Sequence, residues 1–259
     1  MVDRTRAGDL ARYYDLDLED DPGDVDLYRA VLTGVDGPVL ELAAGSGRLA
    51  IPLALAGARV VALDNDAAML DRARTRWAAE RGRRAAERLR TVEADLTTAR
   101  LDERFGLVFI GLNSLLLLDL EAQAAAFRTM AAHLRPDGLA VVDVLLPDAA
   151  DLALYDGRLL LEWVRTDPAT GEVVTKMTSA RHDAATATVE LAQIFESSDP
   201  GGGPTRRVLR QDTLRLVTAR ELVLLAGAAG LAVDQLAGDH QLTPIGPGSE
   251  RAVLLARLV

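Results

Sequence analysis

The first part of the chain contains short runs of consecutive hydrophobic residues that alternate with stretches of helical spacing. Five runs predict strands, at 39–42, 59–63, 89–93, 105–110 and 139–145. Between them, helices are predicted over 48–56, from a cap at Asp66 onward, and over 121–134. Strands that are apolar throughout are typical of a parallel sheet covered on both faces by helices.

The pattern changes at residue 158, where apolar and polar residues begin to alternate. Alternating segments at 159–166, 173–181, 186–196 and 206–217 have the period of half-buried strands. Residues 167–171 have the composition of a hairpin turn, and the Gly- and Pro-rich stretch 197–204 is a loop. Residues 158–217 are therefore predicted to form an inserted antiparallel sheet of three or four strands.

The C-terminal part returns to helix and strand. Thr218 and Glu221 form a predicted capping box for a helix over 218–229. Strands at 231–236 and 252–258 follow and suit a closing antiparallel hairpin. The predicted fold class is α/β, with a Rossmann-like, mostly parallel seven-stranded sheet flanked by helices and a small antiparallel sheet inserted after strand 5.

This pattern divides the chain into three parts. Residues 1–36 are predicted to form an N-terminal helical cap, 37–157 with 218–259 the Rossmann-like domain, and 158–217 the inserted sheet. The insertion follows the fifth strand, which allows it to extend over the carboxyl ends of the parallel strands, where ligands bind. We expect it to serve as a substrate lid, a dimer contact, or both.

Composition narrows the class of protein. Hydrophobic residues make up 49% of the chain, enough for a sizeable core, and Asp and Glu outnumber Lys and Arg by 39 to 29. A net charge of −10 argues against a nucleic-acid partner, which needs a basic face. The chain contains no cysteine, which excludes disulfides and thiolate chemistry and suits a cytoplasmic protein. No apolar run is long enough to span a membrane, and the N-terminus lacks a signal peptide's apolar stretch.

The candidate chemistry lies in the glycine-containing turn after the first strand. Gly45 and Gly47 let the backbone approach a ligand, and the following helix offers free N–H groups. Asp64 follows Gly45 by 19 residues, at the end of the next strand, where a carboxylate accepts both hydroxyls of a ribose. Residues 45–50 also fit the dinucleotide pattern G-x-G-x-x-G/A, so an NAD(P)-dependent oxidoreductase is the alternative.

Three observations favour S-adenosylmethionine over NAD as the ligand. Glu41 lies within the strand end, two residues before the turn, where it can meet a ligand's ammonium directly or through water. Asp95, with Leu96 beside it, ends the third strand, in a position to receive an adenine amino group. The third observation is the predicted antiparallel hairpin at the C-terminal end of the sheet. The oxidoreductase alternative also lacks a Tyr-x-x-x-Lys pair, since the only lysine, Lys176, falls in the inserted sheet.

Together these segments resemble the class I S-adenosylmethionine-dependent methyltransferases. Residues 39–48 (VLELAAGSGR) resemble their first motif, residues 60–70 (VVALDNDAAML) their second, residues 94–96 (ADL) their third, and residues 134–139 (LRPDGL) the turn before their fifth strand. The resemblance covers roughly residues 37 to 146. Ala43 departs from it, because many members have glycine there, although small-amine and amino-sugar N-methyltransferases with alanine are familiar.

The resemblance implies a set of site residues. Those that would border the methionine part are Glu41, Ala43, Gly45 and Gly47. Those that would contact the adenosine are Asp64 at the ribose, Asn65 and Met69 nearby, and Asp95 and Leu96 at the adenine. Asn113 would face the methionine part or the transferring methyl. Tyr13 and Tyr14 resemble a segment that covers the cofactor; the alternative is a helix packed against the sheet edge.

The implied function is S-adenosylmethionine-dependent methyl transfer to a small molecule with a nitrogen or oxygen nucleophile, such as an amine or amino sugar of a natural product. A homodimer and a cytoplasmic location are expected. His182, in the inserted sheet, and Tyr14 are the candidate catalytic residues, ahead of His133 and His240. The spacing of His and carboxylates indicates no metal site. A methyltransferase-like protein that binds the cofactor without transferring methyl is a further alternative.

Overall fold

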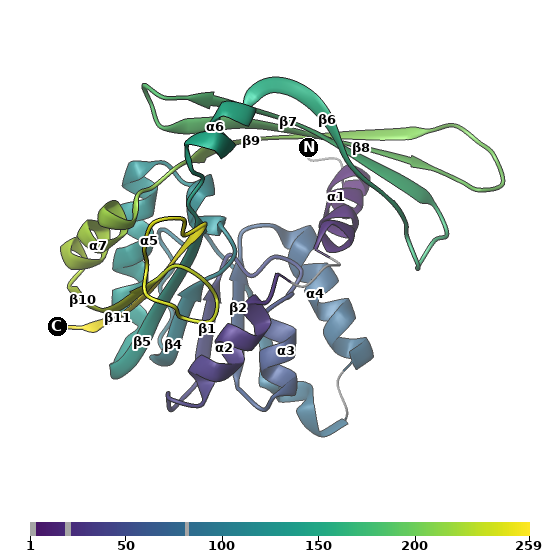
Figure 1. Ribbon diagram of the computed structural model, residues 1–259. Helices are drawn as coiled ribbons and strands as arrows, with labels where there is room; N and C mark the ends of the chain where they lie inside the picture. Colours follow the sequence, from purple (N-terminus) through teal and green to yellow (C-terminus); the bar gives the residue numbers. More distant parts are fainter. Residues whose placement is uncertain (1–3, 19–21, 81–82) are drawn as a thin grey trace. The chain divides into compact units, whose positions relative to one another are not determined.

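The computed structural model describes residues 4–18, 22–80 and 83–259 (Figure 1). The chain divides into two compact units. Unit 1 comprises Met1–Asp20 and Pro147–Leu216, and unit 2 comprises Asp21–Leu146 and Val217–Val259. The predicted N-terminal cap is divided between them: α1 (Arg4–Asp17) belongs to unit 1, and α2 (Asp24–Leu32) belongs to unit 2.

Unit 2 is built on a seven-stranded sheet in the order β10-β11-β5-β4-β1-β2-β3. Its strands are β1 (Val39–Leu42), β2 (Val60–Asp64), β3 (Leu89–Glu93), β4 (Phe105–Ile110), β5 (Leu134–Leu145), β10 (Leu231–Ala237) and β11 (Arg251–Leu258). β11 runs antiparallel to both of its neighbours, and the other pairings are parallel. The predicted fold class is confirmed, including the closing hairpin.

Helices cover both faces of this sheet, as its apolar strands predict. They are α2, α3 (Ala50–Leu55), α4 (Ala67–Glu80), α5 (Leu120–His133) and α7 (Ala219–Ala228), with 3-10 helices η1 (Arg83–Arg88) and η2 (Ser114–Leu117). One face packs against α2, α3 and α4 through a core that includes Tyr28, Ile51 and Trp77; α5 and α7 lie on the other (Figure 1). None of the described helices is both long and apolar enough to cross a membrane.

Helix caps follow the predictions, whereas some element ends differ. The side chain of Asp66 accepts from the backbone at the start of α4, and Thr218 and Glu221 form a complete capping box on α7. α3 begins at Ala50 rather than at residue 48, because the turn that contains Gly47 extends through Leu49. β5 begins five residues before residue 139, because Leu134 already pairs with β4.

Unit 1 contains the predicted antiparallel sheet, with four strands in the order β6-β7-β8-β9. They are β6 (Asp156–Thr166), β7 (Val173–Asp183), β8 (Thr188–Ser198) and β9 (Arg206–Arg215), preceded by the short helix α6 (Ala149–Leu154). α1 packs on this sheet through a small apolar cluster made of Tyr13, Leu16, Val174, Phe195 and Val208.

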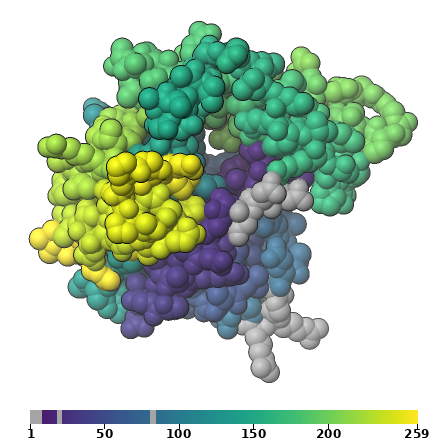
Figure 2. Space-filling view, in the orientation of Figure 1, coloured from purple at the N-terminus to yellow at the C-terminus, as the bar shows by residue number. Residues whose placement is uncertain are grey.

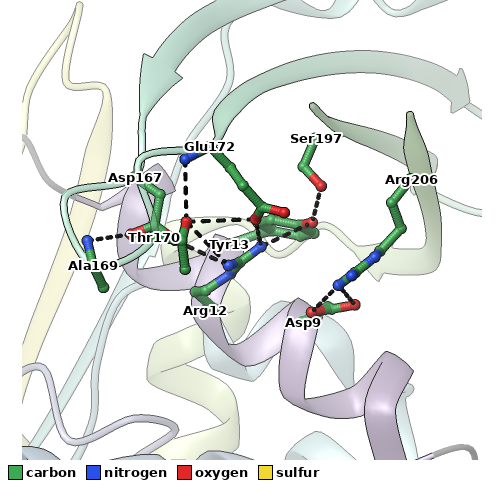
Figure 3. A network of polar contacts seen from close by, with 9 residues as sticks. All are labelled: Asp9, Arg12, Tyr13, Asp167, Ala169, Thr170, Glu172, Ser197 and Arg206. Atoms are coloured by element: carbon green, nitrogen blue, oxygen red, sulfur yellow. Dashed lines mark hydrogen bonds and ion pairs between the residues drawn. The ribbon is translucent and has the colours of Figure 1, made fainter. Parts of the chain in front are cut away.

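Ion pairs attach α1 to the same sheet (Figure 3). The Arg12 guanidinium lies 2.6 Å from the carboxylate of Glu172 and 3.3 Å from that of Asp167. The Lys176 side chain is almost fully buried, and its ammonium lies 2.7 Å from Asp17 and 2.6 Å from Glu162. Buried charges of this kind require their partners, so the only lysine of the chain has a structural role in unit 1.

Candidate active site

The strand order of unit 2 places a topological switch point between β1 and β4. From β1 the chain continues through β2 and β3 on one side, and then through β4 and β5 on the other. In open α/β sheets the connections diverge at such a point and leave a crevice at the carboxyl ends of the strands. The loops after β1 and β4 therefore mark the expected position of a ligand.

The loop after β1 is a tight turn with several residues in the left-handed region. Ala43, Gly45 and Gly47 have φ angles of 61°, 53° and 78°. A Cβ atom on Gly47 would also come within 3.2 Å of Ala73 and Ile51. This turn leads directly into α3, so backbone N–H groups at the helix start face the carboxyl edge of the sheet.

Asp64 joins this turn to the end of β2. Its carboxylate accepts the Gly45 N–H at 2.7 Å on one oxygen and the Asp66 N–H at 2.8 Å on the other. Burial raises the pKa of Asp64, and these backbone hydrogen bonds oppose the rise. Each carboxylate oxygen has a second lone pair. Asp64 is therefore equipped to hold the glycine turn and to accept two ligand hydroxyls at once.

Glu41 is a buried carboxylate next to the switch point. It pairs with Phe109 on β4 and with Ala62 on β2, and its side chain is 4% exposed. Among the residues that the structure describes, its Oε2 atom has no hydrogen-bond partner. Burial raises the pKa of Glu41 well above its ordinary value; Arg48 opposes the rise and Asp64 adds to it. A buried carboxylate with an unsatisfied oxygen fits an ammonium group of a ligand.

Replacing Glu41 by Gln is expected to stabilise the ligand-free protein and to weaken S-adenosylhomocysteine binding about tenfold or more, since a charge-assisted hydrogen bond is lost. A carboxylic acid whose pKa is raised in the folded state contributes most to the free energy of unfolding at low pH. That contribution is lost as the pH rises through the folded pKa. The thermal stabilisation by Glu41→Gln should therefore grow with pH. A variant that is less stable at every pH and binds normally would contradict this role.

The predicted adenosine-contacting residues lie at or after the ends of β2 and β3. Asp95 is exposed, and its Oδ1 accepts the backbone N–H and the hydroxyl of Thr97, both at 2.7 Å. These bonds lower the pKa of Asp95. Leu96 and Met69 are half-buried, and Asn65 is exposed. Because β2 and β3 are parallel neighbours, these side chains belong to one edge of the sheet.

Asn113 connects the ends of β4 and β5. It adopts a left-handed conformation with a φ of 67°, and its backbone N–H donates to the Asp143 carbonyl at 3.0 Å. Its Oδ1 accepts the Leu145 N–H at 2.7 Å and an Arg251 N–H at 3.3 Å. With the oxygen held in this way, the Nδ2 donor is the end of the carboxamide available to a ligand.

The sequence interpretation missed a buried polar cluster beside Asn113. Asp143 is fully buried within β5 and contacts Arg251 at 2.8 Å and His240 at 3.1 Å. The signal was present as one acidic residue inside the apolar run 139–145. Tyr28 was missed too: its ring lies 4.2 Å from Phe109, and in the described parts of the chain its buried hydroxyl has no partner.

Three predicted site residues belong to unit 1: Tyr13 and Tyr14 on α1, and His182 on β7. Tyr13 is fully buried, and its ring is stacked 5.1 Å from that of Phe195. Its hydroxyl lies 3.0 Å from that of Ser197 (Figure 3). This supports the alternative of a helix packed on a sheet, and we remove Tyr13 from the proposed cofactor contacts. Tyr14 is half-buried on α1, and His182 is half-buried on β7 opposite Val189. Their catalytic roles stay predictions.

His133 has a structural position. Its Nε2 accepts the Leu101 N–H at 2.9 Å, which leaves the proton on Nδ1 for the Thr129 carbonyl at 2.7 Å. Metal binding has no support either: among residues 4–18, 22–80 and 83–259, no group of three or more His, Asp or Glu side chains is arranged to hold an ion.

Comparison with known proteins identifies the domain that contains the carboxyl edge of the unit 2 sheet. Residues 39–138 match the family described as "Methyltransferase domain", and this span contains the glycine turn, Glu41, Asp64, Asp95 and Asn113. The chain carries a methyltransferase domain. The predicted resemblance to the S-adenosylmethionine-dependent methyltransferases, with that compound as cofactor, is confirmed. The oxidoreductase alternative is set aside.

The chain is similar to several bacterial methyltransferases. The cypemycin N-terminal methyltransferase of a Streptomyces species is 28% identical over 221 residues, which cover 85% of this chain and 82% of that protein. The CcbJ methyltransferase of Streptomyces caelestis is 27% identical, with a TM-score of 0.76 over 92% of this chain and 96% of that one. A S-adenosylmethionine-dependent methyltransferase of Clostridium acetobutylicum is 17% identical, with a TM-score of 0.78 over 96% and 98%, and shares the fold.

Proposed function

We propose that this methyltransferase transfers a methyl group from S-adenosylmethionine to an amine nitrogen of a small molecule. The observation that carries the cofactor assignment is the presence of two acidic residues on neighbouring strands: Glu41 next to the switch point and Asp64 at the end of β2. One is a buried carboxylate with an unsatisfied oxygen, and the other holds the glycine turn. An ammonium and a ribose on one ligand satisfy both.

The residues of unit 2 supply binding and orientation. Asp64 would accept the ribose hydroxyls, Glu41 the ammonium of the amino-acid part, and Asp95 the adenine amino group. The bound cofactor supplies a methyl group that is already electrophilic because it is attached to a sulfonium. The protein accelerates transfer mainly by holding the acceptor in line with that methyl and by excluding water.

An amine acceptor is supported by chemistry and by a relative. One relative is named as the cypemycin N-terminal methyltransferase, and the N-terminus of a peptide is an amine. This chain carries a net charge of −10, which attracts cationic amines from solution. The attacking nitrogen must be neutral, so the enzyme has to accept or exclude one proton. His182 and Tyr14 are the proposed groups for this step.

Two measurements on the purified full chain test the proposal. Calorimetry should detect binding of S-adenosylhomocysteine, and NADH should give no thermal stabilisation. Incubation with methyl-labelled cofactor and a panel of amines, amino sugars and phenols should label amines. Binding without transfer to any acceptor would favour a protein that keeps the cofactor but has no transferase activity. Absence of binding would reject the proposal.

Other predictions accompany this function. A homodimer, the exclusion of nucleic acid, a cytoplasmic location and the lid or dimer role of residues 158–217 stay predictions. Sedimentation of the full chain tests the dimer directly. An oligomer that persists when the exposed side chains of Leu159 and Leu161 are changed to Ser would exclude this sheet as the contact.

A further inference from the structure

His240 lies in the loop between β10 and β11 and contacts two acceptors. Its Nε2 lies 3.1 Å from a carboxylate oxygen of Asp143, and its Nδ1 lies 3.0 Å from the backbone carbonyl oxygen of Pro22, just before α2. A neutral imidazole can donate from only one ring nitrogen. Since both nitrogens lie within hydrogen-bond distance of an oxygen acceptor, this geometry favours the imidazolium form, which donates from both.

The surrounding charges favour the same form. Asp143 is fully buried and also binds Arg251, so one carboxylate faces two cations. The hydrogen bond that His240 donates to the Asp143 carboxylate raises the pKa of His240, and burial and the repulsion of Arg251 oppose the rise. The groups that face His240 are Asp143 from β5, Arg251 from β11, the neighbouring Asp239 and the Pro22 carbonyl.

The same cluster orients Asn113. Asp143 accepts the Arg251 Nε–H at 2.8 Å, and an Nη2–H of Arg251 reaches the Asn113 side-chain oxygen at 3.3 Å. The Asn113 backbone N–H donates to the carbonyl of Asp143 itself. The charge on His240 is therefore linked to Asn113, at the carboxyl end of β4, through three side-chain contacts: His240–Asp143, Asp143–Arg251 and Arg251–Asn113.

His240 lies at the edge of a cavity. His240, Pro22 and Arg251 line a cavity of about 450 Å³ formed by the β10–β11 loop. The loop, yellow in Figure 2, lies against the purple segment that begins α2, in agreement with the His240–Pro22 contact. His240 therefore borders this cavity, with its side chain 6% exposed.

We propose that His240 is a positioning residue whose imidazolium form fixes Asp143 and Arg251 and thereby orients the Asn113 carboxamide toward the cofactor. This rests on the proposed function and on the predicted position of Asn113, which would face the methionine part of the cofactor or the transferring methyl. His240 touches neither cofactor nor acceptor in this scheme. It acts through Asp143, Arg251 and Asn113.

The proposal gives a defined pH dependence. A histidine whose pKa is raised in the folded state stabilises that state fully at low pH. This stabilisation is lost as the pH rises through the folded pKa. Its support of cofactor binding should therefore fade with increasing pH. Glu41 and the ligand's own ammonium titrate as well, so the informative quantity is the ratio between wild type and a His240 variant at each pH.

The test is calorimetric binding of S-adenosylhomocysteine from about pH 5.5 to pH 9 by wild type, His240→Gln and the exposed loop control Gln241→Ala. At low pH we expect the affinity of His240→Gln for S-adenosylhomocysteine to be at least about fivefold below that of wild type, because a hydrogen bond to a charged group is lost. At high pH the affinity of the variant should approach that of wild type. Gln241→Ala should follow wild type throughout.

A second pair of variants separates positioning from general loop stability. In an Asn113→Ala background, His240→Gln should change affinity by less than about twofold, because the residue through which it acts is gone. A ratio that is constant with pH, or an equal loss in both backgrounds, would overturn the proposal. Failure of the wild type to bind at any pH would instead overturn the proposed function.

Discussion

Replacing Asp64 by Asn is expected to weaken S-adenosylhomocysteine binding about 100-fold or more, because two hydrogen bonds from the ribose to a charged group are lost at about 1.5 kcal/mol each. The amide adds a second effect. Asp64 accepts N–H groups from Gly45 and Asp66 on its two oxygens, and an Asn nitrogen must face one of these donors. The glycine turn then loses a bond that holds it to β2.

Calorimetry with two ligands locates the effect. 5′-Methylthioadenosine keeps the ribose and lacks the amino-acid part, so Asp64→Asn should weaken its binding by a similar factor. Glu41→Gln should weaken S-adenosylhomocysteine binding alone. Asp71→Asn is the matched control, since Asp71 is an exposed acid on α4 that pairs with Arg74. Near-normal affinity of folded Asp64→Asn for both ligands would show that the ribose lies elsewhere.

The sequence was sufficient for the parts of the fold that depend on local patterns. The apolar runs at β1 and β4 are buried along their whole length, and the caps at Asp66 and Thr218 are present. Glu41, Gly45 and Asp64 were also predictable as neighbours, because one strand–turn–helix–strand unit brings them together. A local motif and the pairing of parallel strands determine this part of the site.

Contacts between distant segments were not predictable in the same way. Asp143 meets His240 and Arg251, which are 97 and 108 residues away in the sequence. The hydroxyl of Tyr13 meets Ser197, 184 residues away, so a tyrosine expected at the cofactor lies in the core of unit 1. An acid within an apolar strand indicates that a partner must exist, but the residue that supplies it depends on the completed sheet.

Asp143→Ala is expected to lower the free energy of unfolding of unit 2 by about 3–5 kcal/mol, because it leaves buried cations without their counterion. Arg251 and His240 both bind this carboxylate, and the side chain of His240 is only 6% exposed. The loss should shrink as pH rises through the raised pKa of His240, where one of the two cations becomes neutral.

Tryptophan fluorescence during urea unfolding can report the free energy of unfolding of unit 2 alone. The chain has two tryptophans, Trp77 in unit 2 and Trp163 in unit 1, so a Trp163→Phe background leaves Trp77 as the reporter. Asp234→Ala, which removes half of the exposed pair with Arg257, should change stability by no more than about 0.5 kcal/mol. If Asp143→Ala were as mild as this control, Asp143 would not be the counterion that holds His240 and Arg251, and the route from His240 to Asn113 would lose its central contact.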